Sequence, residues 1–274
     1  MNARRVAVVV RTELRQLAQA RDFWGPMVIL GAIFFAVIPT SLFLTITQIG
    51  DVEVVGKVSQ AVEVLPESTQ SQIPDASPEG RTTYALAVFL LAPIAIVVPL
   101  TISTAVGAAS LVGEREKGTG EFLAHSPAAA KEIYLGKVIA SMVPGYLTTA
   151  VGFGAYSLIV NLLVGPEVGG WFFPTRQWWV MVLWVLPPFL AITLSIVLRL
   201  SGRVRSTAAA QQASGLVTLP LIGIAYAQAT GSMFGAARTG WYVGALAWVI
   251  AVASLAGGMR SVRRARLLGV ADGI

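Results

Sequence analysis

The densest group of chemically active side chains in this sequence lies between residues 113 and 132, where acidic and basic residues alternate. Membrane anchoring alone would be served better by basic residues, so the mixture of signs needs another explanation. We interpret it as a docking surface for another protein, although a solvated loop is the commoner fate of such charge runs. The residues assigned to this surface are Glu114, Arg115, Glu116, Lys117, Gly118, Thr119, Glu121 and Phe122.

Enzymatic chemistry has little support in the sequence. A phosphate-binding loop needs Gly-x-x-x-x-Gly-Lys followed by Ser or Thr, and in the nearest candidate Gly118 is followed directly by Thr119 with no lysine between them. The chain has no cysteine and one histidine, His125, which has no carboxylate or nucleophile at motif spacing. We therefore expect no catalytic residue, no metal site and no cofactor in this chain.

The composition of the chain indicates that membrane-spanning helices position the charged segment. The chain has 274 residues, of which 55% are hydrophobic and only 12% are charged, and its mean hydropathy is +0.71. These values do not fit a soluble domain and indicate an all-helical integral membrane protein. Six stretches are long and apolar enough to cross a bilayer: 27–48, 84–112, 133–163, 178–198, 207–229 and 241–259.

The placement of the charges predicts the orientation of these spans. With the N-terminus inside, 16 of the 20 lysines and arginines fall on the cytoplasmic side and 4 on the outer side. The positive-inside rule then places both termini in the cytoplasm, and a prokaryotic plasma (inner) membrane suits such a protein. The net charge of +6 is therefore a topology signal. A nucleic-acid-binding protein would need a clustered basic face on a soluble surface.

Residues 1–25 are predicted to form an amphipathic helix lying at the membrane interface. Val6, Val10, Leu14 and Leu17 recur at helical spacing, and Arg4, Arg11, Arg15 and Asp22 share another face. Gly25-Pro26 is expected to end this helix. A cleaved signal peptide is the competing interpretation, but the apolar run starts late and is too long.

The remaining layout follows from these spans. Residues 26–259 form a six-helix transmembrane domain, with an outer loop at 49–83 that holds a short helix around Val54 to Leu65, and residues 260–274 form a basic cytoplasmic tail. After the turn at Gly118 to Gly120, a new helix is expected to start at Ser126-Pro127, because serine is a good N-cap and proline suits the first helical turn.

The charged segment resembles that of the permease subunits of type-2 ATP-binding-cassette exporters, which carry Glu-Arg-Glu-x-Gly-Thr-x-Glu, then a proline, then Gly-Lys. Residues 203–220 also resemble the loop that enters the fifth span in this family, and the order of an elbow helix and six spans is similar. Gly120 departs from the pattern, because relatives have a bulky apolar residue there. The matching residues are Glu114, Arg115, Glu116, Gly118, Thr119, Glu121, Pro127, Gly136 and Lys137.

The resemblance implies a function. In the family the charged segment is a coupling helix that docks into an ATP-binding subunit, which binds ATP and Mg. It also implies a second permease, identical or homologous, in the same complex, and export of a drug, lipid, peptide or similar cargo. The neutral spans favour a hydrophobic or amphipathic one. The alternative is a stand-alone channel or integral membrane enzyme, which would not need the coupling signature.

A substrate path could be lined by aromatic and amide side chains within the predicted spans. The competing interpretation is that these side chains face lipid, which is at least as common in such positions. The predicted lining residues are Phe34, Phe89, Phe153, Tyr156, Gln211 and Gln212.

Overall fold

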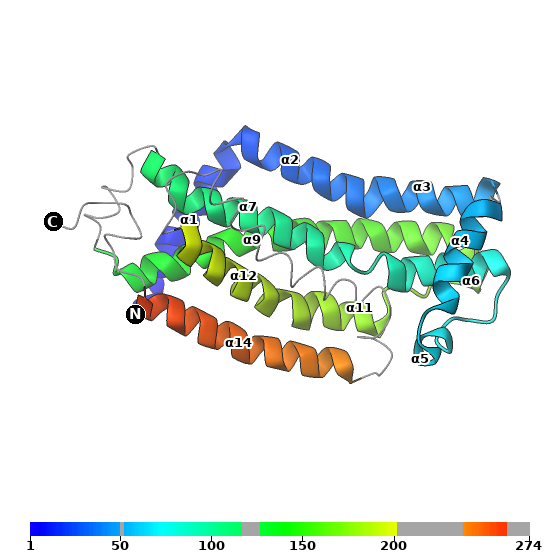
Figure 1. The fold of residues 1–274 in the computed structure, drawn as a ribbon. Helices are drawn as coiled ribbons and strands as arrows, with labels where there is room; N and C mark the ends of the chain where they lie inside the picture. The colour runs from blue at the N-terminus through cyan, green and yellow to red at the C-terminus, as the bar shows by residue number, and fades with distance from the viewer. Residues whose placement is uncertain (50–51, 117–126, 202–237, 262–274) are drawn as a thin grey trace.

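The computed structural model describes residues 1–49, 52–116, 127–201 and 238–261. Every regular element in these residues is helical, and the long helices run side by side along one direction (Figure 1). The first segments are α1 Ala3–Gln19, α2 Arg21–Ala32, η1 Ile33–Val37, α3 Ile38–Leu44 and η2 Thr45–Ile49. After them come α4 Val52–Glu63, α5 Glu67–Gln70, α6 Pro78–Ala85, η3 Leu86–Leu90, α7 Ile94–Glu116, α9 Ala130–Leu163, α10 Gly165–Val168, α11 Arg176–Val180, η4 Met181–Val185, α12 Leu186–Ser201 and α14 Thr239–Ser261.

Five helical stretches in the described residues are long and apolar enough to cross a membrane. They confirm five of the predicted spans, and the sixth, 207–229, lies outside the described residues. The second and third have 33 and 34 residues, more than the roughly 20 that a bilayer needs. The five stretches are Trp24–Thr47, Pro78–Ser110, Ala130–Leu163, Arg176–Leu200 and Thr239–Arg260.

Two predicted helix boundaries are wrong. The N-terminal helix ends at Ala20, whose ψ of 88° is not helical, and α2 then continues through Pro26. Pro26 lies beyond the first turn of α2 and removes one helical hydrogen bond, a loss that membrane-spanning helices tolerate. The helix expected to begin at Ser126-Pro127 begins at Ala130, with Ala129 in the N-cap position.

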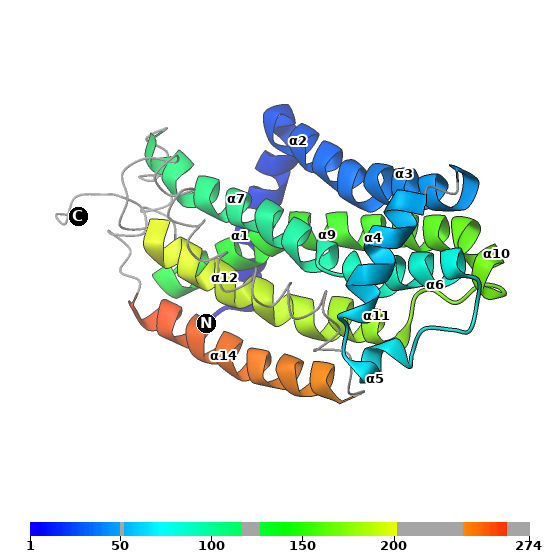
Figure 2. The same ribbon diagram turned by 45° about the vertical axis from the view of Figure 1, so that its right-hand side comes forward.

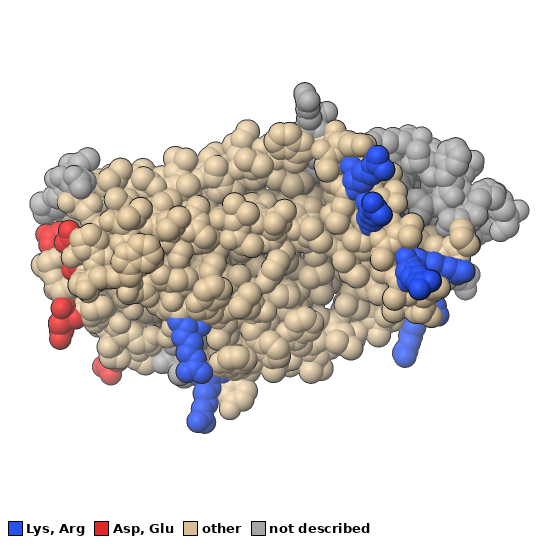
Figure 3. Space-filling view, turned by 180° about the vertical axis from the view of Figure 1, so that it is seen from behind, with Lys and Arg blue, Asp and Glu red and all other residues tan. Residues whose placement is uncertain are grey.

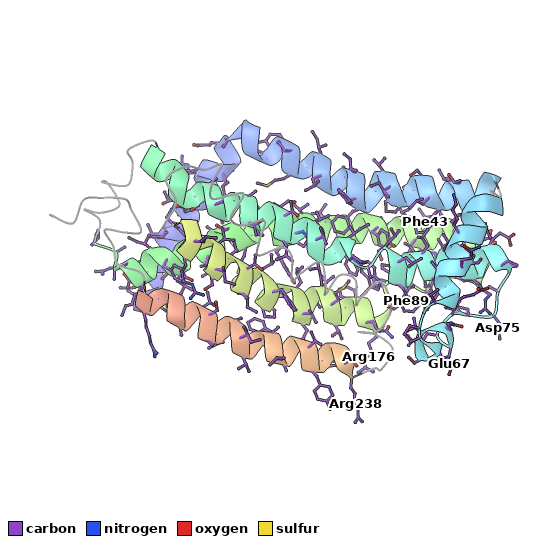
Figure 4. The ribbon with its side chains drawn as sticks, viewed as in Figure 1. Phe43, Glu67, Asp75, Phe89, Arg176 and Arg238 are labelled. Carbon is purple, nitrogen blue, oxygen red and sulfur yellow. The ribbon has the colours of Figure 1, made fainter. Side chains whose placement is uncertain are left out.

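The predicted helix in the loop at 49–83 is confirmed by α4. Together with α5, α6 and α10 it lies at the end of the bundle away from the N-terminus (Figures 1 and 2). We call this the far end, and the end where α1 lies the N-terminal end. Glu67, Asp75, Arg176 and Arg238 all lie toward the far end (Figure 4).

An aromatic core holds the far end together. Trp178 from α11 packs against Phe153 and Tyr156 of α9, with ring centroids 5.9 and 5.3 Å apart, and against Phe173 at 4.9 Å. Each of these four side chains is at least 94% buried. Burial of large aromatic side chains is a strong source of packing energy, so α9 and α11 are firmly joined here.

The π-helical segment η3 is tied to the same core by hydrogen bonds. The Tyr156 hydroxyl donates to the Ala87 carbonyl at 2.8 Å, and the Trp178 indole N–H donates to the Val88 carbonyl at 2.9 Å. Side chains from two other helices therefore supply partners to carbonyls of an irregular helical turn, where such partners limit the cost of burial.

Candidate functional site

The predicted docking residues fall at the junction between two long helices. Glu114, Arg115 and Glu116 form the last turn of α7, at the N-terminal end of the bundle. Lys117, Gly118, Thr119, Glu121 and Phe122 lie outside the described residues. α9 begins just after this segment and runs back beside α7 in the opposite direction (Figure 1). Residues 117–126 therefore connect two neighbouring helices that extend into the bundle.

Helix α1 packs on the first turns of α9, beside this junction. At Gly136 the approach is so close that an added Cβ would lie 2.6 Å from Val9 Cγ1. Val6 is 93% buried, and Val10, Leu14 and Leu17 are half-buried, so the apolar face predicted from the sequence is the one turned toward the protein. Glycine at position 136 is what allows the two helices to come together.

A buried ion pair joins the same three helices. Lys137 of α9, whose side chain is fully buried, donates to Glu13 of α1. Its ammonium nitrogen also lies 3.0 Å from the Ser110 carbonyl oxygen and 3.1 Å from the Ser110 hydroxyl of α7. Ser110 in turn donates to the other Glu13 carboxylate oxygen at 3.1 Å. One lysine thus connects α1, α7 and α9.

This arrangement satisfies the requirements of buried charges. A buried lysine or glutamate is costly unless it is paired and its remaining hydrogen-bonding positions are filled. The lysine has three donors, and three oxygens lie within reach of it. The network therefore makes the mutual placement of α1, α7 and α9 specific, because any shift would separate charges in a poorly solvated place.

A second set of contacts fixes the end of α1 to the start of α9. Glu132 accepts the Asn2 N–H at 2.6 Å and the Ala129 N–H at 2.9 Å. Arg5 donates to the Pro127 carbonyl at 2.8 Å, and its guanidinium lies 3.9 Å from Glu132. Ala129 has no side-chain oxygen that could cap α9, and the Glu132 carboxylate instead accepts a backbone N–H at the start of the helix. α1 thus holds Pro127 and the start of α9 in place.

A polar network also joins α9 to α12 and α14. Arg199 donates to the hydroxyls of Ser195 at 3.0 Å and Ser254 at 2.7 Å, and to the Ser195 carbonyl at 3.0 Å. Tyr134 donates to the Ser195 hydroxyl at 2.8 Å. These residues lie in the last turns of α12 and α14 and the first turns of α9, so the three helices are also connected at the N-terminal end of the bundle.

Sequence reasoning missed Glu13, Ser110 and the Arg199 network. Gly136 and Lys137 were noticed only as parts of a motif, without a partner. A signal was present: Glu13 stands between Val10 and Leu17 on the apolar side of its helix, where an acid needs a cation. The sequence does not reveal which cation, because Lys137 is 124 residues away.

The predicted substrate-path residues separate into three groups. Phe89, Phe153 and Tyr156 are at least 94% buried and belong to one hydrophobic core, while Phe34 is half-buried against it. Phe89 from η3 and Phe43 from α3 both point between the helices (Figure 4). Gln211 and Gln212 lie outside the described residues.

In the described residues, no group of three or more histidine, cysteine, aspartate or glutamate side chains could hold a metal ion.

The comparison with family models gives these features a context. The model of the ABC-2 family transporter proteins matches residues 7–238, most of the chain. The chain belongs to this family. A search of the curated proteins found no match.

As an ABC-2 transporter protein, the chain is a multi-pass membrane permease. The match begins within α1 and includes the junction and residues 117–126. It ends at residue 238, just before α14. Family membership implies an ATP-binding partner subunit, which accords with the absence of a phosphate loop from this sequence.

Proposed function

We propose that this chain is the permease subunit of an ATP-driven exporter. Two permeases, identical or homologous, would combine with two ATP-binding subunits that bind ATP and Mg. The cargo is hydrophobic or amphipathic, a proposal supported by the apolar character of the candidate spans. Family membership favours this function over a channel or a membrane enzyme, since neither of those needs an ATPase partner.

The observation that carries the proposal is the junction beside residues 117–126. The segment is continuous with α7 and α9, two of the longest helices, and Lys137 links both to α1. A force applied to Glu114, Arg115 and Glu116 at the end of α7 would reach three packed helices rather than one. We assign the ATPase-docking surface to residues 114–122 on this ground.

The proposed orientation places the N-terminal end in the cytoplasm of a prokaryotic cell. It is supported by the charges of the described residues, since acidic side chains gather at one end of the visible surface and most basic ones lie toward the other, with Arg176 and Arg238 as exceptions (Figures 3 and 4). Arg4, Arg5, Arg11 and Arg15 lie on α1 at the N-terminal end. The positive-inside rule assigns such an end to the cytoplasm.

The proposal is tested by co-expression with an ATP-binding-cassette protein, which we expect to be encoded beside its gene. The two chains should purify together, and ATP hydrolysis by the complex should depend on the partner's phosphate-loop lysine. The permease alone should hydrolyse no ATP. Hydrolysis by the isolated permease, or transport by it in vesicles without the partner, would refute the proposal.

A further inference from the structure

Three arginines form a stripe on the side of α1 that faces away from the protein. Arg4, Arg11 and Arg15 lie at positions i, i+7 and i+11, so on an ideal helix with about 100° per residue they fall within roughly 40° of one another. All three are exposed, whereas Val6 and Glu13, on the opposite side of the helix, are buried. We call these three residues the arginine stripe.

The position of α1 along the bundle axis determines which molecules the arginine stripe can contact. α1 contacts α9 at Gly136 and Lys137 and α7 at Ser110, four residues before the charged run that starts at Glu114. The first candidate span begins at Trp24, directly after the turn that ends α1. α1 therefore lies where the apolar spans end, the level of lipid headgroups.

Glu114, Arg115 and Glu116 of the proposed ATPase-docking surface lie farther along α7 than Ser110. α7 continues for six residues beyond Ser110 to Glu116, which is about 9 Å of helix. Arg11 and Arg15 flank Glu13, which meets Ser110, whereas Arg4 is next to Arg5, which donates to the Pro127 carbonyl. Basic side chains at this end project from the side of the bundle in Figure 3.

We propose that the arginine stripe binds the headgroups of acidic phospholipids. Guanidinium groups form paired hydrogen bonds to phosphate oxygens, and the stripe has the charge that an anionic headgroup layer complements. An unattached amphipathic helix would insert its apolar face into the acyl chains, but here that face packs on α9. Binding through the stripe therefore depends on lipid charge, and it does not require the proposed ATPase partner.

The test uses the full-length chain purified in a neutral detergent and titrated with phosphatidylglycerol or phosphatidylcholine. Thermal unfolding reports binding, because a ligand that binds only the folded state raises the midpoint. Phosphatidylglycerol should stabilise the wild type at lower concentration than phosphatidylcholine, and this preference should weaken in high salt. Changing all three arginines to glutamine should raise the half-saturating concentration of phosphatidylglycerol at least tenfold.

Two matched variants complete the experiment. Arg176→Gln with Arg238→Gln removes exposed arginines from the far end and should leave the preference within twofold of the wild type. Replacement of the stripe by lysines keeps the charge and should keep most of the preference. If the triple glutamine variant fails to insert, Arg15→Gln alone should weaken phosphatidylglycerol binding roughly fivefold, as expected for one basic residue near an anionic surface.

Three results would overturn the inference. The first is an unchanged phosphatidylglycerol preference in the glutamine variants, and the second is equal stabilisation of the wild type by both lipids. The third is loss of the co-purifying ATP-binding subunit in a triple variant that keeps its lipid preference, which would make the stripe a protein interface.

Discussion

Lys137 shows how one side chain can set the arrangement of three helices. Its ammonium group is withdrawn from solvent and meets Glu13 and Ser110, which belong to helices on either side of it. Such a contact contributes more to specificity than to net stability, because the cost of removing both charges from water offsets much of their attraction. Removing one partner is a different matter, since the other charge stays buried.

We predict that Lys137→Met lowers the thermal unfolding midpoint strongly. The substitution leaves the Glu13 carboxylate without its cation, and breaking a buried pair costs about 3–5 kcal/mol. Adding Glu13→Gln should recover much of the loss, because neither charge then remains. Lys131→Met is the control, since Lys131 is an exposed lysine of the same helix. A Lys137→Met protein as stable as the control would show that the pair does not hold the junction.

Gly136 gives a second prediction at this scale. Gly136→Ala should destabilise the protein by about 1–3 kcal/mol, because the new methyl group would overlap Val9 in a filled contact between α1 and α9. Gly154→Ala is its control in the same helix, where an added Cβ meets no atom within 4 Å. There the better helix propensity of alanine should leave stability unchanged or raise it slightly. Unfolding midpoints measured side by side decide the comparison, and equal effects at the two sites would contradict it.

Among the elements, the helices were easier to predict than their ends. Long apolar runs identify spans because a bilayer admits few other structures, and five spans were found in this way. The turn at Ala20 was missed because Gly25-Pro26 is the stronger helix breaker in the sequence, yet a membrane-spanning helix can continue through a proline. The start of α9 was missed because Glu132, three residues into the helix, provides the cap.

The segment that joins α7 to α9 carries the prediction at this scale. Reversing Glu114 and Glu116 to lysine should abolish substrate-stimulated ATP hydrolysis and transport, with expression and detergent thermal stability little changed. The physical reason is that charge reversal replaces attraction by repulsion at the proposed interface, where close pairs are worth several kcal/mol if desolvated. Reconstituted vesicles measure both activities.

Glu63→Lys with Glu67→Lys provides a control of equal charge change at the far end, where it should leave coupling intact. A Glu114 and Glu116 variant that exports normally with full ATPase stimulation would return this segment to the solvated-loop interpretation.

For the whole molecule, the sequence predicted the class of protein and the distribution of charge, but not the contacts between distant helices. Composition and the positive-inside count depend on sums over many residues, so single errors matter little. The link between Glu13 and Lys137 depends on a tertiary arrangement that no local pattern contains. The role of residues 114–122 and of the proposed substrate path stays a prediction.

The orientation itself can be measured, since the chain has no native cysteine. Single cysteines at Lys57 and Arg238 should react with a membrane-impermeant maleimide in intact cells. Cysteines at Lys117, Arg203 and Arg264 should react only after permeabilisation, because the proposed topology places them in the cytoplasm. Labelling at position 117 in intact cells would contradict the proposed topology.

The bonds that Tyr156 and Trp178 make to η3 have a mechanical consequence. Tyr156 and Trp178 donate hydrogen bonds to two successive carbonyls of η3. If α9 or α11 slid past η3, these buried carbonyls would lose their hydrogen-bond donors, which is costly. The parts of α9, α11 and η3 that meet here are therefore expected to keep their relative positions if the helices tilt.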